Sequence, residues 1–255
     1  QPRWSLLSVG LPQARWDSSF LAEFYKGVRA LAREHGVSII GGDISRTPAH
    51  VVVDSVALGE VARGRGVLRS GARRGDRIYV TGMLGGAAAG LQILRNDARL
   101  HAGARRTGAR RALISRQTRP APRVEWGVFL CQKRLATAMI DLSDGLSSDL
   151  AHLCRESGVG AKLEAARMPV DSHIKSAGVD EEDALSLALN GGEDFELLFT
   201  VRVRDAAKLP EKLGGVPATY IGDVTADAGI IELRTGAGVK ILKPSGFEHF
   251  KRTRR

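Results

Sequence analysis

Acidic residues follow strand-like runs at three places in the chain, at Gly41–Asp43, Asp141–Gly145 and Asn190–Glu196. Carboxylate oxygens are ligands that Mg²⁺ prefers in proteins, and bound Mg²⁺ contacts phosphate oxygens in turn. Each segment taken singly is also compatible with a merely structural role. Taken together, the three segments favour a site for cations and phosphate groups.

The first segment, Gly41-Gly42-Asp43, comes directly after a short β-branched run, and we expect it to form a loop. Two glycines let the backbone approach a bulky anion closely, and Asp43 can hold a cation beside it. Glycine–aspartate pairs are also common in ordinary turns. This segment alone therefore does not establish a site.

The second segment, Asp141-Leu142-Ser143-Asp144-Gly145, joins a predicted strand to the start of a predicted helix. The N–H groups and the dipole at a helix N-terminus favour negative charge. Ser143 or Asp144 could serve simply as a helix cap, but a cap does not account for Asp141. Two carboxylates with a hydroxyl between them predict Mg²⁺ ions that bridge to phosphate oxygens.

The third segment, Asn190–Glu196, has three acids in four positions and leads directly into the apolar run Leu197–Phe199. A solvated acidic face would explain the charge. Charge at the mouth of a buried strand instead predicts a site at the edge of a sheet.

Several common catalytic patterns are absent from the sequence. It contains no G-x-x-x-x-G-K-[ST] phosphate loop, no G-x-G-x-x-G after residues 77–81, no protein-kinase motifs and no H-E-x-x-H. The two cysteines, Cys131 and Cys154, lack metal-type spacing, and we expect both to be core residues in a reducing, cytoplasmic compartment. We expect neither a membrane span nor export.

Hydrophobic periodicity predicts the elements that must position these residues. Helices are predicted over 18–35, 87–94, 124–134, 144–157, 181–189 and 205–213, and strands over 37–40, 51–61, 77–81, 137–140, 161–164, 195–203 and 218–224. This mixture predicts an α/β fold of the α+β sandwich type. A glycine- and arginine-rich turn at 63–66 predicts a boundary between a domain at 1–65 and another at 66–255.

The net charge of +10 is concentrated between Arg95 and Arg123, where nine arginines face a single acid, Asp97. A basic surface of this kind can bind phosphate-rich partners. Glycines and prolines interrupt its helical period, however, and no aromatic residues interleave with the arginines to stack on bases. We therefore expect a solvated, partly mobile surface connection and no binding of nucleic acid.

From about Ser5 to Phe250 the chain resembles the thiamine-monophosphate kinases in the order and spacing of several blocks. The blocks are Leu11-Pro12, Gly41-Gly42-Asp43, Leu68-Arg69-Ser70-Gly71-Ala72, Val80-Thr81-Gly82, the run 138–146, Gly192-Glu193-Asp194-Phe195-Glu196-Leu197 and Gly246-Phe247-Glu248-His249-Phe250. The resemblance implies the fold of aminoimidazole ribonucleotide synthetase. Residues 1–65 would then be the remainder of an N-terminal domain for ATP binding and dimerisation, and 66–255 a complete C-terminal α/β domain.

The resemblance also implies the reaction, in which the γ-phosphoryl group of ATP moves to thiamine monophosphate without a general base. The resemblance implies that ATP is bound by Gly42, Asp43, Arg69 and Ser143. It implies that several Mg²⁺ ions are bound by Asp43, Asp141 and Asp144. Thiamine monophosphate would be held by Glu193 and Phe247.

The chain departs from the family pattern at its beginning. Family members carry further aspartates, and strands of their homodimer, in a segment that would precede Gln1. From this difference we expect slow turnover by the chain as given, and a homodimer in the full-length family. Two alternatives remain at this point: another ATP-using relative of aminoimidazole ribonucleotide synthetase, or a catalytically impaired remnant that binds nucleotide.

Overall fold

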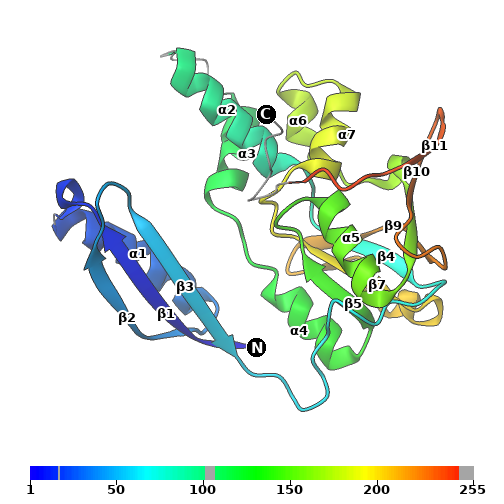
Figure 1. Ribbon diagram of the computed structural model, residues 1–255, viewed down its shortest axis with the longest axis horizontal. Coiled ribbons are helices and arrows are strands. Elements are labelled where there is room, and N and C mark those ends of the chain that lie inside the picture. The colour runs from blue at the N-terminus through cyan, green and yellow to red at the C-terminus, as the bar shows by residue number, and fades with distance from the viewer. Residues whose placement is uncertain (17, 101–106, 247–255) are drawn as a thin grey trace. The chain divides into compact units, whose positions relative to one another are not determined.

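The computed structural model describes residues 1–16, 18–100 and 107–246, which divide into two compact units, Gln1–Gly66 and Val67–Arg255 (Figure 1). Each unit has its own sheet and its own helices, so the predicted α/β class is confirmed. In the described part of the chain, no helix combines the length and the apolar character that crossing a bilayer requires.

The first unit is built on β1 (Pro2–Leu11), which lies between β2 (Ser38–Arg46) and β3 (Val52–Gly59) in a three-stranded sheet of the described residues. β1 is parallel to β2 and antiparallel to β3. The 3₁₀ turn η1 (Gln13–Arg15) and the helix α1 (Ser18–Glu34) connect β1 to β2. β1 was not predicted as a strand, although its buried residues alternate as a strand requires.

The Gly41–Asp43 segment is not the loop that the sequence predicted, because it continues β2 and pairs with Leu6, Leu7 and Ser8 of β1. Gly42 has φ of 156°, and a Cβ there would overlap the carbonyl oxygen of Leu7. The glycine therefore permits a close approach of two strands rather than a turn.

The second unit contains, within the described residues, an eight-stranded mixed sheet. Its order is β11 (Gly238–Ile241), β10 (Ile231–Thr235), β6 (Gly160–Glu164), β9 (Val216–Thr225), β4 (Arg77–Thr81), β7 (Leu197–Val201) and β5 (Ala136–Asp141), with β8 (Lys212–Leu213) paired to β9. β6 and β10 are parallel, and the other neighbouring pairs are antiparallel.

Helices cover both faces of this sheet (Figure 1). The helices of this unit in the described residues are α2 (Gly86–Leu100), α3 (Gly108–Thr118), α4 (Val124–Lys133), α5 (Leu146–Ser157), α6 (Ser172–Ser176) and α7 (Glu181–Asn190), with 3₁₀ turns η2 (Ala165–Arg167) and η3 (Val203–Lys208). Successive residues of β4 point to opposite faces. Ile78 and Val80 join a core cluster with α5, and Tyr79 joins Trp126 of α4 in a second cluster.

Two predictions in this unit were wrong. The expected helix over 205–213 is the short turn η3 followed by β8, because Pro210 stops the chain from continuing as a helix. The arginine-rich segment is not a broken connection, since α3 forms there with Thr107 as its N-cap and Leu113 buried against α2 and α6. Arg105 and Arg106 lie outside the described residues.

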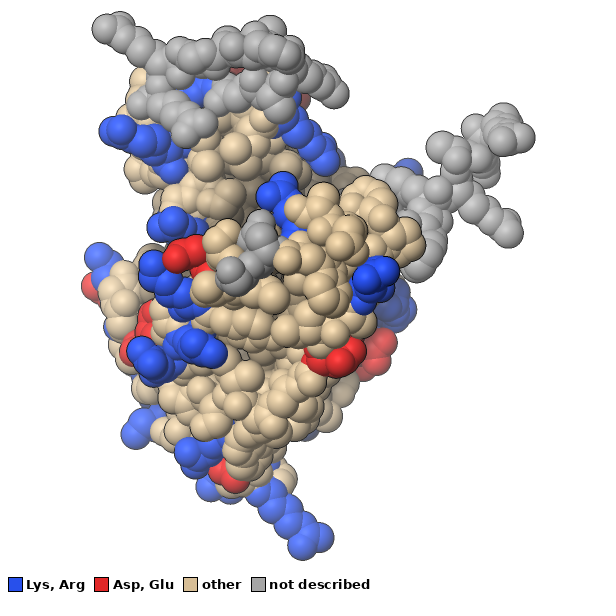
Figure 2. All heavy atoms as spheres, turned by 90° about the vertical axis from the view of Figure 1, so that its left-hand side faces the viewer, with Lys and Arg blue, Asp and Glu red and all other residues tan. Residues whose placement is uncertain are grey.

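On the face drawn in Figure 2, Lys and Arg side chains are scattered among uncharged residues and acids, and do not merge into one continuous basic patch. Binding of a nucleic-acid backbone typically requires a continuous basic patch or stripe, which this face does not have. The expectation that the chain does not bind nucleic acid stays a prediction.

Two glycines in helices give opposite expectations on replacement by alanine. A Cβ on Gly90 of α2 would overlap the carbonyl group of Leu113 in α3, whereas a Cβ on Gly127 of α4 would meet nothing within 4 Å. We expect Gly90→Ala to lower the free energy of unfolding by about 1–3 kcal/mol through overpacking. We expect Gly127→Ala to raise it by roughly 0.5–1 kcal/mol through helix propensity. Urea unfolding measures both, and equal effects would contradict the tight α2–α3 contact.

Candidate functional site

The segment Asp141–Gly145 forms the turn between the end of β5 and the start of α5. Leu142 is buried in the core and anchors the turn, while Asp141 is exposed and Asp144 is half-buried. Neither Ser143 nor Asp144 caps α5, because the N-cap residue is Gly145 and no side-chain cap hydrogen bond is formed. The capping role that could have explained these polar residues is therefore excluded.

Asp149 lies in the first turn of α5 and binds the backbone of the preceding segment Asp141–Gly145. Its Oδ2 accepts hydrogen bonds from the N–H groups of Asp144 and Gly145, both at 3.1 Å. Burial first, and the nearby charges of Asp144 and Asp141 second, raise the pKa of Asp149 to about 6, although the two backbone donors oppose the shift. Asp149 therefore lies close enough to Asp141 and Asp144 to be affected by the charge of both.

The segment Asn190–Glu196 lies directly beside this turn and is joined to it through the backbone. Glu193 N–H donates to Ser143 C=O at 2.9 Å, Phe195 N–H donates to Leu142 C=O at 2.9 Å, and Leu142 N–H donates to Glu196 C=O at 2.8 Å. Glu193 and Phe195 have φ of 71° and 49°, a backbone region that residues other than glycine rarely adopt. Strained backbone of this kind clusters at functional sites.

Arg69 and Asp141 line one open cavity of about 430 Å³ together with the apolar residues Val67, Leu68, Met139, Ile140 and Leu197. The Ser157 hydroxyl of α5 donates to the Arg69 carbonyl at 3.3 Å and so ties this segment to the helix. The structure thus brings Arg69 to the turn that carries Asp141.

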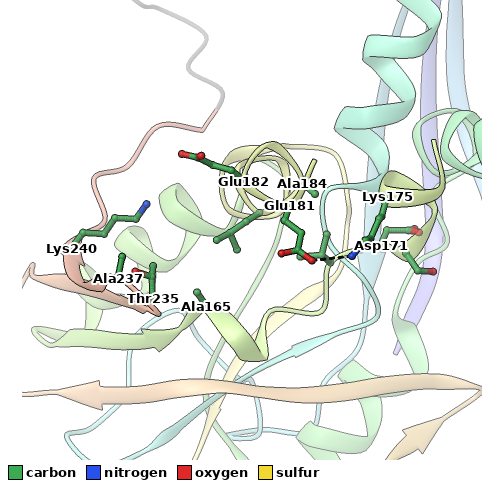
Figure 3. A pocket seen from close by; sticks show the side chains of 12 residues that line it. Ala165, Asp171, Lys175, Glu181, Glu182, Ala184, Thr235, Ala237 and Lys240 are labelled. Carbon is green, nitrogen blue, oxygen red and sulfur yellow. Dashed lines mark hydrogen bonds and ion pairs between the residues drawn. The ribbon is translucent and has the colours of Figure 1, made fainter. Parts of the chain in front are cut away.

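A larger cavity of about 630 Å³ lies elsewhere in the second unit, between η2, α6, α7 and the turn of β10 and β11 (Figure 3). Lys175 and Glu181 on its wall form an ion pair of 2.9 Å. None of the residues expected to carry the chemistry lines it.

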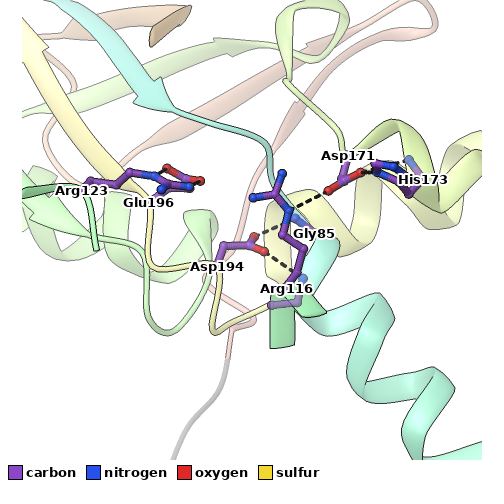
Figure 4. Close-up of polar contacts among 8 residues, drawn as sticks. Gly85, Arg116, Arg123, Asp171, His173, Asp194 and Glu196 are labelled. Atoms are coloured by element: carbon purple, nitrogen blue, oxygen red, sulfur yellow. Dashed lines mark hydrogen bonds and ion pairs between the residues drawn. The ribbon is translucent and has the colours of Figure 1, made fainter. Parts of the chain in front are cut away.

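Asp194 caps α2 rather than facing solvent. Its carboxylate accepts hydrogen bonds from Gly85 N–H at 2.7 Å and Ala87 N–H at 3.1 Å (Figure 4). Burial raises the pKa of Asp194 to about 6, although the two backbone donors oppose the shift. Of the three acids in this segment, Asp194 is therefore structural.

The raised pKa of Asp194 predicts how stability depends on pH. An unfolded aspartate has a pKa near 3.8, so between pH 3.8 and 6 the folded state retains a proton that the unfolded state has lost. The contribution of this group is fully present below pH 3.8 and is lost as pH rises through 6, by about 3 kcal/mol. We expect urea unfolding at pH 4 to 7 to show a smaller loss in Asp194→Asn than in the wild type, because the variant keeps only the contribution of Asp149, whose pKa is also raised to about 6. Glu182→Gln, which removes an exposed carboxylate, should keep the wild-type profile.

Glu196 is also structural, because it is buried and forms an ion pair with Arg123 (Figure 4). Arg123 donates through Nε and Nη2 to the two carboxylate oxygens, both at 2.5 Å, and Thr81 donates its hydroxyl at 2.7 Å. A Cβ on Gly82 would overlap this carboxylate, so the glycine leaves room for it. Hydrogen bonds to Asp194 and Glu196 therefore fix the segment Asn190–Glu196 at two points.

The free side chains form a separate group. Among the described residues, no side-chain hydrogen bond or ion pair involves Asp141, Ser143, Asp144 or Glu193. These four residues lie on two hydrogen-bonded segments, and they keep their full capacity to bind a ligand. In the part of the chain that the structure describes, no group of three or more His, Cys, Asp or Glu side chains is placed to hold a metal ion.

Known proteins match this chain along almost its whole length. The AIR synthase related protein family matches with its N-terminal domain over residues 1–61 and its C-terminal domain over residues 73–233. The thiamine-monophosphate kinase of Escherichia coli (strain K12) is 41% identical over 254 residues, which cover 98% of this chain and 74% of the relative. The chain belongs to the thiamine-monophosphate kinase family. The thiamine-monophosphate kinase of Bacillus subtilis (strain 168) is 32% identical over 98% of this chain and 75% of its own length.

Solved structures of thiamine-monophosphate kinases share the fold. The enzyme of Stenotrophomonas maltophilia K279a superposes with a TM-score of 0.81 at 34% identity, over 91% of this chain and 72% of that one. The structure of AaThiL complexed with AMPPCP and TMP has a TM-score of 0.81 at 31% identity, over 98% and 74%. The hydrogenase maturation protein HypE of E. coli, with a TM-score of 0.76 at 18% identity over 98% and 76%, shows a common fold alone.

The residues expected from the thiamine-monophosphate kinase resemblance are distributed over both units. Gly42 and Asp43 belong to β2 of the first unit, and Arg69, Asp141, Ser143, Asp144 and Glu193 to the second. Phe247 lies outside the described residues. Residues 245–246 lie beside the Asp141–Gly145 turn, since Gly246 N–H donates to the Ser148 hydroxyl at 3.0 Å.

Sequence reasoning missed Asp149 and Arg123. Asp149 had one available signal, an acid in the first turn of a helix that follows an acidic loop. Arg123 was grouped with eight other arginines, of which Arg95, Arg111, Arg116 and Arg119 are exposed, and no local pattern pointed to its partner Glu196, 73 positions away.

Proposed function

We propose that this chain transfers the γ-phosphoryl group of ATP to the phosphate of thiamine monophosphate and so forms thiamine diphosphate and ADP. The observation that carries the proposal is the group of four polar side chains, Asp141, Ser143, Asp144 and Glu193, that the fold leaves unpaired on two adjacent segments. Kinship with thiamine-monophosphate kinases, and the AMPPCP and TMP bound by AaThiL, support ATP and thiamine monophosphate as the substrates.

Mg²⁺ is part of this proposal, with Asp141 and Asp144 as ligands in the second unit and Asp43 as a ligand in the first. Asp141 and Asp144 lie three positions apart on one turn with unpaired carboxylates, next to the buried Asp149, and a cation bound there would offset this local negative charge. Bound Mg²⁺ would neutralise charge on the phosphate groups as the phosphoryl group is transferred.

The remaining chemistry needs positioning and charge more than proton transfer. The second pKa of a phosphate monoester is about 6, so the attacking oxygen is largely ionised at neutral pH and needs no general base. Arg69 adds positive charge beside Asp141, the hydroxyl of Ser143 can donate to a phosphate oxygen, and Gly42 is assigned to ATP as the neighbour of Asp43 in β2. Glu193 carries a negative charge toward the cationic thiazolium ring of the substrate, and Phe247 supplies an apolar contact.

A homodimer is proposed for the chain as well. Trp4 of β1 and Val56 and Leu58 of β3 are exposed on the same face of the first unit's sheet, which supports an apolar face that another copy would cover. Sedimentation equilibrium distinguishes a dimer from a monomer.

The proposed function is tested by incubating the chain with ATP, Mg²⁺ and thiamine monophosphate and separating the products by chromatography. We expect thiamine diphosphate and ADP in equal amounts. Thiamine in place of its monophosphate should give neither product, because the acceptor phosphate is missing. Release of ADP without thiamine diphosphate would contradict the assignment and favour an ATP-using relative with another acceptor.

A further inference from the structure

Asp149 is a buried carboxylate that binds backbone groups of the turn carrying Asp141 and Asp144. It is 2% exposed, and its Oδ2 accepts from two consecutive N–H groups, those of Asp144 and Gly145. An uncompensated buried carboxylate would be costly, so this residue is stable in its position because of those two donors.

The two donors lie where the chain changes direction between the turn and α5. Gly145 has φ of 113°, and a Cβ there would lie 2.9 Å from the carbonyl carbon of Asn190. The turn therefore fits between Asp149 on one side and the Asn190–Glu196 segment on the other. Any rotation of the Asp144 peptide would break a hydrogen bond to Asp149 and would move the Asp144 side chain with it.

The same hydrogen bonds change how phosphate can reach this helix. The start of a helix binds anions through unpaired N–H groups, as the sequence led us to expect for α5. Here the N–H groups of Asp144 and Gly145 already bind the carboxylate of Asp149. Phosphate oxygens therefore cannot bind these two N–H groups while Asp149 accepts from them.

We propose that Asp149 is a positioning residue, which fixes the Asp144–Gly145 peptides so that Asp141 and Asp144 present their carboxylates to a nucleotide-bound cation. The inference rests on the proposed function for the identity of the ligand. The hydrogen bonds from which it is argued lie within this chain and do not depend on that function. Residues that orient metal ligands without touching the metal typically change metal affinity or activity by about 10–100-fold.

The experiment compares Asp149→Asn with Asp76→Asn as a matched control. Asp76 is 5% exposed and accepts from Arg73 N–H at 3.0 Å and the Thr137 hydroxyl at 2.7 Å, at the opposite end of β5 from Asp141. Both variants lose a buried carboxylate, so both should be less stable in urea. Calorimetry with AMPPCP and Mg²⁺ should show about 10–100-fold weaker binding for Asp149→Asn and binding within about twofold of wild type for Asp76→Asn.

Two further measurements separate positioning from charge and from folding. Asp149→Glu retains the charge but shifts the carboxylate by one methylene, so it should recover only part of the affinity. Amide hydrogen exchange in the wild type should show protection at Asp144 and Gly145, which Asp149→Asn removes. The wild-type protection remains measurable even if the asparagine variant does not fold.

The inference is overturned if Asp149→Asn binds AMPPCP with Mg²⁺ as the control does, if Asp149→Glu restores full affinity, or if the wild-type amides exchange freely.

In steady-state assays, Asp149→Asn should raise the half-saturating concentrations of Mg²⁺ and ATP but leave the KM for thiamine monophosphate within about twofold. A chain that binds AMPPCP in this way yet makes no thiamine diphosphate would refute the proposed function and leave the role of Asp149 intact.

Discussion

Removing Arg123 is expected to lower the free energy of unfolding by about 3–5 kcal/mol, because it leaves the carboxylate of Glu196 buried without its counter-ion. The Arg123 side chain is 10% exposed and that of Glu196 is 1% exposed, so water cannot replace the lost partner. Urea unfolding of Arg123→Met measures the effect. Arg119→Met, four residues earlier and exposed, is the matched control and should change stability by less than about 0.5 kcal/mol.

A double variant distinguishes a lost charge pair from lost packing. In Arg123→Met with Glu196→Gln, the buried negative charge is gone, while the hydroxyl of Thr81 can still donate to the amide oxygen. We expect this double variant to be more stable than Arg123→Met alone. If it is less stable by the sum of both single effects, the two residues act independently and the ion pair is not what stabilises this region.

Replacing Asp141 by asparagine is expected to lower kcat by about 10²–10³-fold, the range found when one group that stabilises transition-state charge is removed. The Asp141 side chain is exposed and forms no hydrogen bond with another described residue, so stability in urea should stay unchanged. Binding of AMPPCP with Mg²⁺ should weaken by roughly 1.5–3 kcal/mol, the value of one charge-assisted contact.

Glu156→Gln is the control for this variant, because it removes an exposed carboxylate at the other end of α5. It should retain wild-type kcat and the wild-type requirement for Mg²⁺. An Asp141→Asn variant with unchanged kcat at every Mg²⁺ concentration would exclude Asp141 as a cation ligand and would leave Asp144 to be tested in the same way.

Local sequence patterns were sufficient for the elements around the turn. Leu146, Leu150 and Leu153 recur on one face of the predicted helix, and Gly158 follows it, which matches the end of α5 at Ser157. The predicted start at Asp144 is two residues early, because the positive φ of Gly145 prevents the helix from beginning there. Periodicity shows which face is buried, but not the conformation of a single peptide.

The arginine-rich segment shows a different limit. Its glycines and prolines were taken as interruptions of a helix, but Gly108 lies at the start of α3 and Pro120 lies beyond its end. The same residue types interrupt a helix from within and delimit it from outside, and composition cannot distinguish these cases.

The hydrogen bonds and the ion pair that fix the Asn190–Glu196 segment could not be predicted from any local pattern. Arg123 and Glu196 are 73 positions apart, and Gly85 and Asp194 are 109 positions apart. These contacts depend on β7 lying between β4 and β5, which is a property of strand order. The sequence identified three acids as one group, whereas the fold uses two of them as structural partners and leaves Glu193 unpaired.

The place of β5 at the edge of its sheet affects how the second unit can be produced alone. The segment before β4 lies along that edge, where Met139 N–H donates to Leu68 C=O at 2.9 Å. The C-terminal family match begins at residue 73, so a fragment cut there would keep every strand of the sheet and lose this covering segment. An uncovered edge strand pairs with strands of other molecules. A fragment that begins at Arg63 would retain the cover, and we expect it to stay monodisperse where the shorter fragment aggregates.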